Sequence, residues 1–360
     1  MARIETHAAP HLGNWSQAVA AFLQSRSGLP DLVGFATSGS SGGLPKMILF
    51  TPAALAAAAR GAVLHLGAQE GDWCCPLPDY HVGGDMIYRR ARLAGTRVHA
   101  LEGRWNPAAF ARLALERRCA WSSLVPAQVV DLVREGVEAP ACLRGVVVGG
   151  GRLDRETGLA ARRLGWPVVQ SYGMTEAGSQ VATARPGEPF ENDWLPLLPH
   201  WKALVDAAGF LCLEGEALFH AIVHTGAAGR FVYEPRDLTR PWKSRDLVEL
   251  KDGMLRFVRR RDRVVKIVGE LVDLDAVEAD LAREAPGCAV VELAEARRGW
   301  ALVACGENGP LLREAMARWN REVPGFMRVA HAVETVLPRN AMGKLDRAAL
   351  RELAARAVSE

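Results

Sequence analysis

The chain has 360 residues, 49% of them hydrophobic and 24% charged, which is typical of a folded protein large enough for two domains. Its net charge of +3 is spread along the sequence, which argues against a nucleic-acid-binding protein. Seven cysteines occur without a C-x-x-C pair, so the sequence favours a reducing, cytoplasmic location over a zinc site or a disulfide framework.

Short apolar runs alternate with helical stretches between about residues 30 and 170. Before them, residues 1–15 lack the apolar core of a signal peptide, and the longest apolar stretch (53–66) is too short to cross a bilayer. The runs predict buried strands, and the stretches between them predict helices: strands at 96–101, 120–125, 144–148 and 167–170, and helices at 53–66, 86–93, 107–116, 127–134 and 155–164. This alternation predicts an α/β fold with a mostly parallel sheet covered on both faces.

The segments become shorter and strand-like after residue 205. Five of them predict a small β subdomain that closes the large domain: 209–214, 217–224, 229–234, 247–250 and 254–258. Charge density rises at 259–263, which we interpret as a hinge between an N-terminal domain (1–258) and a C-terminal domain (264–360). Strand and helix patterns mix in the last region, which predicts a small α+β domain.

A glycine- and hydroxyl-rich stretch near the N-terminus has the composition of a phosphate-binding loop. Its glycines let backbone N–H groups turn toward one point, and hydroxyls and a lysine add donors and charge. It lacks the Walker pattern, and a flexible linker is the alternative interpretation. The candidate phosphate ligands are Thr37, Ser38, Gly39, Ser40, Ser41, Gly42 and Lys46.

A second segment, Ser171-Tyr172-Gly173-Met174-Thr175-Glu176, follows a predicted strand, where α/β sheets place ligands. The two segments resemble, in order, the phosphate loop and the Tyr-Gly-x-Thr-Glu motif of the adenylate-forming (AMP-binding) superfamily, although this loop has an extra glycine. The resemblance implies use of ATP, Mg²⁺ and coenzyme A. It places Tyr172 and Gly173 at adenine, Thr175 at the α-phosphate and Glu176 on Mg²⁺, a hard cation that prefers oxygen ligands.

Weaker matches follow in the family's order. The resemblance implies that a glycine-rich turn lies on the adenine side, that Asp246 accepts hydrogen bonds from the ribose and that Arg260 reaches the nucleotide. Asp262 would be the hinge pivot, and Gly269 would line the pantetheine tunnel. The turn consists of Gly149, Gly150 and Gly151.

The segment from Leu337 to Arg347 is similar to the family's C-terminal Leu-Pro-x-x-x-x-Gly-Lys loop. The resemblance implies that Lys344 enters the active site and bridges the acyl carboxylate and the α-phosphate. An ammonium group there would stabilise the charge that develops during adenylate formation.

Within the superfamily, the segments 122–128 and 172–179 look most like those of the o-succinylbenzoate–CoA ligases of menaquinone biosynthesis. The resemblance places His81 beside the acyl carboxylate, as an aromatic or imidazole gate, and Ser123 in the acyl pocket. That substrate has a second carboxylate, for which Arg90 is a candidate partner, because a guanidinium matches a carboxylate geometrically.

The phosphate loop begins unusually early, at Thr37, so we expect most of the family's N-terminal subdomain to be absent and one flank to be exposed or remodelled in a homodimer. The expected partners are a small carboxylic acid, ATP and CoA, with no nucleic acid and no membrane. Other interpretations are another small acyl- or aryl-CoA synthetase, an adenylating enzyme that loads a carrier protein, and a catalytically silent nucleotide-binding protein.

Overall fold

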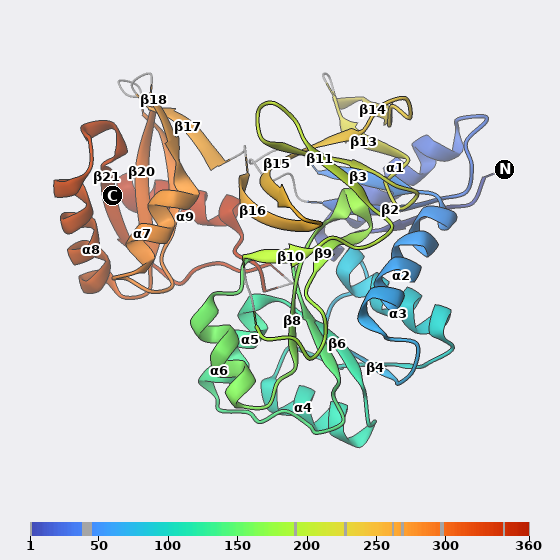
Figure 1. The fold of residues 1–360 in the computed structure, drawn as a ribbon. Helices are drawn as coiled ribbons and strands as arrows, with labels where there is room; N and C mark the ends of the chain where they lie inside the picture. Colours follow the sequence, from blue (N-terminus) through green and yellow to red (C-terminus); the bar gives the residue numbers. More distant parts are fainter. Residues whose placement is uncertain are drawn as a thin grey trace.

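The computed structural model describes residues 2–37, 45–190, 193–226, 229–260, 263–267, 270–295, 299–340 and 343–359. Its C-terminal elements gather on one side of the larger N-terminal part (Figure 1). None of the helices in these residues has the length and apolar character needed to cross a bilayer.

A six-stranded sheet organises the lower part of the molecule in Figure 1, in the order β5-β4-β6-β7-β8-β9. Its first five strands are parallel and β9 is an antiparallel edge, which confirms the predicted mostly parallel sheet. The strands are β4 (Trp73–Cys75), β5 (Val98–Ala100), β6 (Trp121–Leu124), β7 (Gly145–Val148), β8 (Val168–Met174) and β9 (Ser179–Thr183). The helices that alternate with the parallel strands are α3 (Val82–Ala94), α4 (Pro107–Glu116), α5 (Pro126–Arg134) and α6 (Arg155–Arg163).

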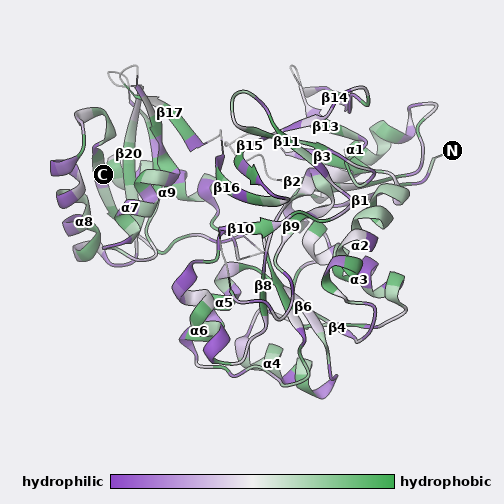
Figure 2. Cartoon of the chain, in the orientation of Figure 1, coloured by the Kyte–Doolittle hydropathy of each residue, from purple (hydrophilic) through white to green (hydrophobic). Residues whose placement is uncertain are grey.

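Capping explains where several of these helices begin. Asn106 and Asp154 accept hydrogen bonds from the backbone N–H groups of Ala109 and Thr157, at the starts of α4 and α6. The apolar side of the helices packs on the sheet. Because β4, β6, β7 and β8 run parallel, their carboxyl ends lie along one edge. Hydrophobic residues therefore follow the buried faces of the elements (Figure 2).

A second sheet has the order β1-β2-β3-β13-β14 and corrects one prediction. Segments 217–224 and 229–234 were expected in the small β subdomain, but β13 (Ala221–Thr225) and β14 (Phe231–Pro235) extend the sheet that contains β3 (Lys46–Phe50). A short strand pattern predicts a strand but not its partner. The other strands are β1 (Ile4–His7) and β2 (Leu32–Thr37).

The N-terminal segment covers one face of this second sheet. Val19 and Leu23 of α1 (Gly13–Gln24) pack on Leu32, Met47 and other buried residues of that face. The opposite face packs on α2 (Pro52–Leu66). The chain's own first helix therefore covers this face of the second sheet.

An antiparallel sheet, β10-β16-β15-β12-β11, forms the expected small β subdomain. Its longest strands, β15 (Trp242–Lys251) and β16 (Met254–Arg260), form a hairpin through Asp252 and Gly253, both at positive φ. The hairpin carries the chain from this sheet to the C-terminal elements. The remaining strands are β10 (Trp194–Pro196), β11 (Lys202–Val205) and β12 (Phe210–Glu214).

The C-terminal region has its own sheets and cores. A hairpin of β17 (Val264–Ile267) and β18 (Glu270–Asp273) precedes the three-stranded sheet β19-β20-β21. The two hydrophobic clusters of this region contain only residues from Val265 onward. The other elements are α7 (Leu274–Ala282), β19 (Ala289–Glu295), β20 (Gly299–Gly306), α8 (Gly309–Glu322), β21 (Val329–Glu334) and α9 (Arg347–Ser359).

Candidate active site

Two cavities meet where the C-terminal region touches the large sheet. The inner cavity, of about 130 Å³, lies among α3, β6, β7, β8 and β9. The outer cavity, of about 420 Å³, reaches from the sheet edge to β15 and β16. They share lining residues that include His81, Gly150, Thr175 and Lys344. A group that reacts at this junction would have one end in each cavity.

Lys344 comes from the C-terminal loop and ends at the junction. Gly343 adopts φ +71°, and Lys344 N donates to Asn340 Oδ1 at 3.1 Å while Asn340 N donates to Lys344 O at 2.8 Å. This tight turn directs the side chain over Gly150, where an added Cβ would lie 2.4 Å from Lys344 Cε and 2.7 Å from Nζ. Gly150 is therefore required to leave room for the lysine, and the structure brings together two residues that are far apart in the sequence.

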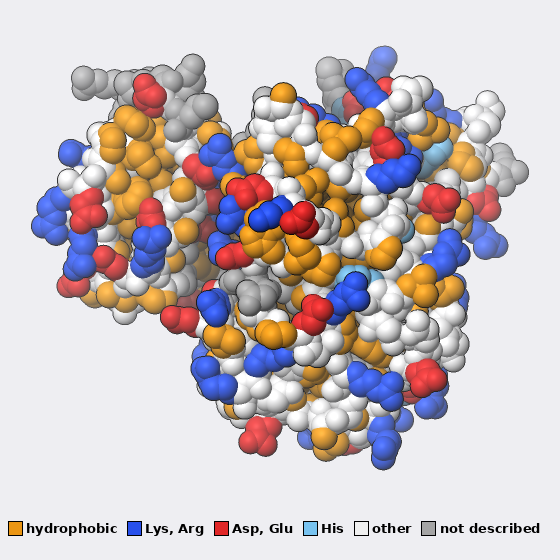
Figure 3. All heavy atoms as spheres, viewed as in Figure 1, with side chains coloured by type: hydrophobic (Ala, Val, Ile, Leu, Met, Phe, Trp, Pro, Cys, Tyr) orange, Lys and Arg blue, Asp and Glu red, His pale blue; other side chains and the backbone are white. Residues whose placement is uncertain are grey.

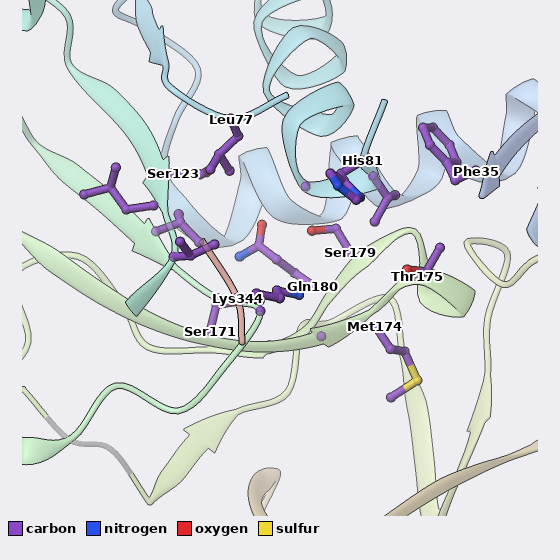
Figure 4. A pocket seen from close by; sticks show the side chains of 18 of the residues that line it. Phe35, Leu77, His81, Ser123, Ser171, Met174, Thr175, Ser179, Gln180 and Lys344 are labelled. Atoms are coloured by element: carbon purple, nitrogen blue, oxygen red, sulfur yellow. The ribbon is translucent and has the colours of Figure 1, made fainter. Parts of the chain in front are cut away.

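The ammonium group of Lys344 lies in a dry and positively charged setting. Burial lowers its pKa, and the charge of Arg260 lowers it further. In Figure 4, Lys344, His81, Ser179 and Gln180 lie around the same space. The lysine can thus serve as a donor to an anion placed between the two cavities.

The outer cavity contains a hydrogen-bonded group built from three elements. Tyr172 of β8 donates its hydroxyl to Asp246 Oδ2 of β15 at 2.6 Å, and Arg260 Nε of β16 pairs with Asp246 Oδ1 at 3.0 Å. Phe257 packs beside Tyr172, with ring centroids 5.6 Å apart. Burial and the charge of Asp246 raise the pKa of Tyr172 well above its usual value, so the phenol stays protonated.

The rest of the outer cavity suits a polyanion. Cationic side chains outnumber the acidic ones that line it: Lys46, Arg152, Arg245, Arg260 and Lys344 against Glu176, Asp193 and Asp246. Figure 3 shows charges of both signs mixed over the visible face, without a large basic patch. The lining of the outer cavity therefore carries an excess of positive charge, as expected for a small anionic ligand.

Glu176 is the candidate ligand for a metal. It lies in a short 3₁₀ turn (Thr175–Ala177) after β8, and burial raises its pKa, while the charges of Arg260 and Lys46 act in the opposite direction. The search for metal sites, limited to the described residues, found no group of three or more His, Cys, Asp or Glu. One buried carboxylate beside a basic cavity fits Mg²⁺ that takes its other oxygens from a polyphosphate.

Arg90 is the most unusual group of the inner cavity. Its side chain lies on α3, is 2% exposed and sits with its guanidinium carbon 5.8 Å from the Trp73 ring centroid. Its Nε has no hydrogen-bond partner among the described residues. Burial lowers its pKa to about 10, although Asp85 acts in the opposite direction. Asp85 itself pairs with Arg89, so Arg90 is positioned to receive an anion from the cavity.

Further polar atoms face this arginine's cavity without a partner in the described structure: Ser123 Oγ and Gln180 Oε1. Gln180 is held by its own amide, which donates to Thr183 Oγ1 at 2.8 Å, and Thr183 also bonds Ser171 Oγ at 2.8 Å. Sequence reasoning missed Gln180 and Ser171. The available signal was a set of polar residues inside strands whose neighbours are apolar, which favours a lined cavity over a dry core.

His81 lies at the N-terminus of α3, at the junction. Burial lowers its pKa to about 4, and the charge of Lys344 contributes in the same direction. The imidazole is therefore neutral at neutral pH. This agrees with an uncharged gate beside a carboxylate, the role implied by the family resemblance.

The other expected site residues are distributed as follows. Thr37 and Lys46 line the outer cavity from both sides of the phosphate loop, and Gly149, Gly150, Gly151 and Gly173 line one or both cavities. Ser38, Gly39, Ser40, Ser41 and Gly42 of the loop, the hinge residue Asp262, and Gly269 lie outside the described residues. Asp246, the residue expected to bind ribose, lines the outer cavity and pairs with Tyr172 and Arg260.

Comparisons with known proteins agree with this geometry. The family model described as AMP-binding enzyme matches residues 31–203. A probable 2-succinylbenzoate–CoA ligase from Mycobacterium tuberculosis is 32% identical over 337 residues, covering 87% of this chain and 82% of that protein. The 2-succinylbenzoate–CoA ligase of Bacillus cytotoxicus is 28% identical over 344 residues, covering 88% and 69%.

A solved structure supports the fold. The o-succinylbenzoate CoA synthetase (MenE) from Bacillus subtilis, in complex with the acyl-adenylate intermediate OSB-AMP, matches with a TM-score of 0.70 and 23% identity. The match covers 89% of this chain and 68% of that one. The predicted fold class is confirmed: a large α/β region with a small β subdomain, followed by a small α+β region.

Proposed function

We propose that this chain, which belongs to the AMP-binding enzyme family, is an AMP-forming acid–CoA ligase that activates o-succinylbenzoate. The observation that carries the proposal is the buried ammonium of Lys344 at the junction of two cavities. One cavity is basic, and the other contains Arg90, whose buried Nε has no hydrogen-bond partner among the described residues. The basic cavity suits ATP, and the other suits an acid with a second negative charge. The names of the relatives support the same substrate.

In the first half-reaction, the substrate carboxylate lies at the junction and attacks the α-phosphorus of ATP. A new oxygen–phosphorus bond forms, pyrophosphate leaves, and the products are acyl-AMP and pyrophosphate. Lys344 donates to the oxygens that gain charge, and its buried position strengthens this interaction. Thr175 lines both cavities and can donate to the α-phosphate.

The neighbouring residues orient the nucleotide. Tyr172 offers a ring face to adenine, and Asp246 and Arg260 lie where the ribose and phosphates would follow. Glu176 would hold Mg²⁺, which supplies charge neutralisation to the phosphates. These roles follow from the family resemblance and are consistent with the cavity that contains the residues.

In the second half-reaction, the CoA thiol attacks the acyl carbonyl, a thioester forms and AMP leaves. Lys344 blocks the junction in this structure, so the C-terminal region must rotate before CoA enters. We place the domains at 1–258 and 264–360 with a hinge at 259–263, a division supported by the separate hydrophobic cores. Asp262 would be the pivot, and Gly269 would line the path of pantetheine.

The substrate assignment depends on Arg90. One carboxylate of o-succinylbenzoate reacts at the junction, and the other would pair with the buried guanidinium, with Ser123 as an additional donor. A monocarboxylic acid would leave Arg90 unpaired. The inner cavity should therefore select acids with a second anionic group.

ATP–pyrophosphate exchange with a panel of acids tests the adenylation step, and CoA-dependent release of AMP tests the complete reaction. We expect o-succinylbenzoate to give rates well above those of benzoate, acetate or long-chain acids. A comparable or higher rate with a fatty acid or simple aryl acid would overturn the substrate assignment. Absence of exchange with every acid would favour a catalytically silent nucleotide-binding protein.

A further inference from the structure

A partly buried carboxylate in the C-terminal region, Glu278 of α7, connects two parts of the chain that the reaction must move together. Its Oε1 accepts a hydrogen bond from Arg347 Nη2 at 2.7 Å, and its Oε2 accepts from Arg347 Nη1 at 2.9 Å and from Arg263 Nη2 at 3.0 Å. The backbone N–H of Val290 donates to Oε2 at 2.7 Å. One carboxylate thus neutralises two guanidinium groups, one of them through a bidentate pair.

The positions of the two arginines in the chain give this cluster its significance. Arg263 is the last residue of the segment 259–263 that we interpret as the hinge, three residues after the end of β16. Arg347 begins α9, three residues after Lys344. Glu278 therefore joins the point where the C-terminal region starts to the base of the lysine loop.

Additional bonds make the connection stiff. Arg263 Nε pairs with Asp275 Oδ1 at 2.7 Å, and its Nη1 donates to the carbonyl oxygen of Val290 at 2.9 Å. Asp346, between the lysine and Arg347, donates its backbone N–H to Pro338 O at 2.8 Å, which closes the lysine loop. Rotation at the hinge would therefore be transmitted to Lys344 without loss in a flexible segment.

We propose that Glu278 is a positioning residue for adenylation. It connects the C-terminal end of the hinge to the loop of Lys344, so that the C-terminal region and Lys344 move as a rigid unit. The proposal rests on the function proposed above for Lys344. Glu278 touches neither cavity, so it acts through Arg263 and Arg347. Removing its charge would leave two guanidinium groups facing each other, which would separate and release the base of the loop.

The expected effect is specific to one half-reaction. A catalytic group displaced by 1 Å can lose about 100-fold in rate, and only adenylation uses Lys344. Glu278→Gln should lower the kcat of ATP–pyrophosphate exchange at least about tenfold, with little change in the KM for the acid. Attack of CoA on supplied acyl-AMP should stay within about twofold of the parent rate.

Glu292→Gln is the matched control. Glu292 is buried in the C-terminal region and pairs with Arg351 of α9 at 2.6 Å. It makes no hydrogen bond to Arg263 or Arg347 in the described structure, and it acts on Arg347 through its charge alone. It should leave both half-reactions near the parent rates, even if it destabilises the region. Equal losses of exchange in the two variants, or equal slowing of both half-reactions by Glu278→Gln, would overturn the proposal.

Hydrogen exchange measured by mass spectrometry tests the coupling without any activity. In Glu278→Gln, backbone amides of residues 338–350 should exchange faster than in the parent, whereas Glu292→Gln should leave this segment protected. Unchanged protection in Glu278→Gln would refute the coupling whether or not the chain is a ligase. Arg347→Lys keeps the charge but not the bidentate geometry, so it should give a smaller increase and serves if Glu278→Gln fails to fold.

Discussion

The charged groups of the inner and outer cavities differ in their bonding, although the outer cavity also has a buried polar atom, Gln170 Oε1, without a partner in the described structure. In the outer cavity, Tyr172, Asp246 and Arg260 are bonded to one another before any ligand arrives. In the inner cavity, atoms of Arg90 and Ser123 are buried without partners in the described part of the chain. The outer cavity is therefore preorganised, whereas the inner cavity depends on its ligand to complete its hydrogen bonds. Substitutions of the paired residues in the outer cavity should therefore lower stability, whereas substitution of Arg90 in the inner cavity should change substrate selection without lowering stability.

The largest effect is expected at Lys344, where the cavities meet. Among the residues that the structure describes, Lys344 is the only lysine or arginine whose side chain lines both cavities, and Lys344→Ala removes it. Adenylate formation should fall by about 1,000-fold, the upper end for loss of one transition-state donor. Attack of CoA on supplied acyl-AMP should be spared, because the lysine withdraws before that step. Equal loss in both half-reactions would contradict the rotation.

The motifs of the outer cavity could be predicted from the sequence because they are local. The segment from Ser171 to Glu176 carries its own strand and turn, so its position at the sheet edge follows from the pattern. Lys344 was predicted through the resemblance of its loop to the C-terminal loop of the family. The mutual bonding of Tyr172, Asp246 and Arg260 could not be predicted, because it depends on how three distant strands meet.

The inner cavity was harder to predict. Arg90 was a candidate because the substrate of the ligases that the chain resembles has a second carboxylate, but surface exposure is the usual state of an arginine. Its burial depends on the packing of α3 against β4 and β6, which no local pattern specifies. The same reason applies to β13 and β14, whose partners in the sheet were predicted wrongly, and to α1, which was not predicted.

The second prediction tests whether the inner cavity needs its ligand to complete its hydrogen bonds. Arg90→Met removes an unpaired buried charge, so the free energy of unfolding should stay equal or rise by about 1–4 kcal/mol. At the same time, kcat/KM for o-succinylbenzoate should fall about 100-fold, the equivalent of one charge-assisted hydrogen bond. Urea unfolding and steady-state kinetics measure the two effects.

Benzoate provides the control for Arg90→Met, because it has no second carboxylate to lose a partner. Its slow turnover should change little in the variant. A loss of stability together with unchanged selectivity would indicate that Arg90 is a structural residue and would remove the reason for assigning a dicarboxylic acid.

The third prediction concerns the paired side chains of the outer cavity. Asp246→Asn weakens the bonds to both Tyr172 and Arg260, so here truncation should cost stability, by about 1–2 kcal/mol. The KM for ATP should rise about tenfold, while the KM for the acid should stay constant. If Asp246→Asn were as stable as the parent, the outer cavity would not be preorganised by this group, and the contrast with Arg90→Met would disappear.

The smallest expected effect is a change in the pH dependence of the free energy of unfolding, caused by His81 at the junction of the two cavities. The pKa of His81 is about 4 in the folded chain and close to 6.5 when the chain is unfolded. The unfolded state therefore binds the extra proton between these values, and stability is lost as pH falls from 6.5 to 4. His81→Phe should reduce this loss by about 1–2 kcal/mol, allowing for partial exposure, and should leave stability at pH 8 nearly unchanged.

His200, whose pKa is also about 4, lies outside both cavities, so its part of the acid loss should persist in the variant. Urea unfolding at pH 8, 6 and 5 provides the measurement. An unchanged pH dependence in His81→Phe would mean that the imidazole at the junction takes up its proton as easily in the folded chain as in the unfolded one, in conflict with a buried neutral gate beside Lys344.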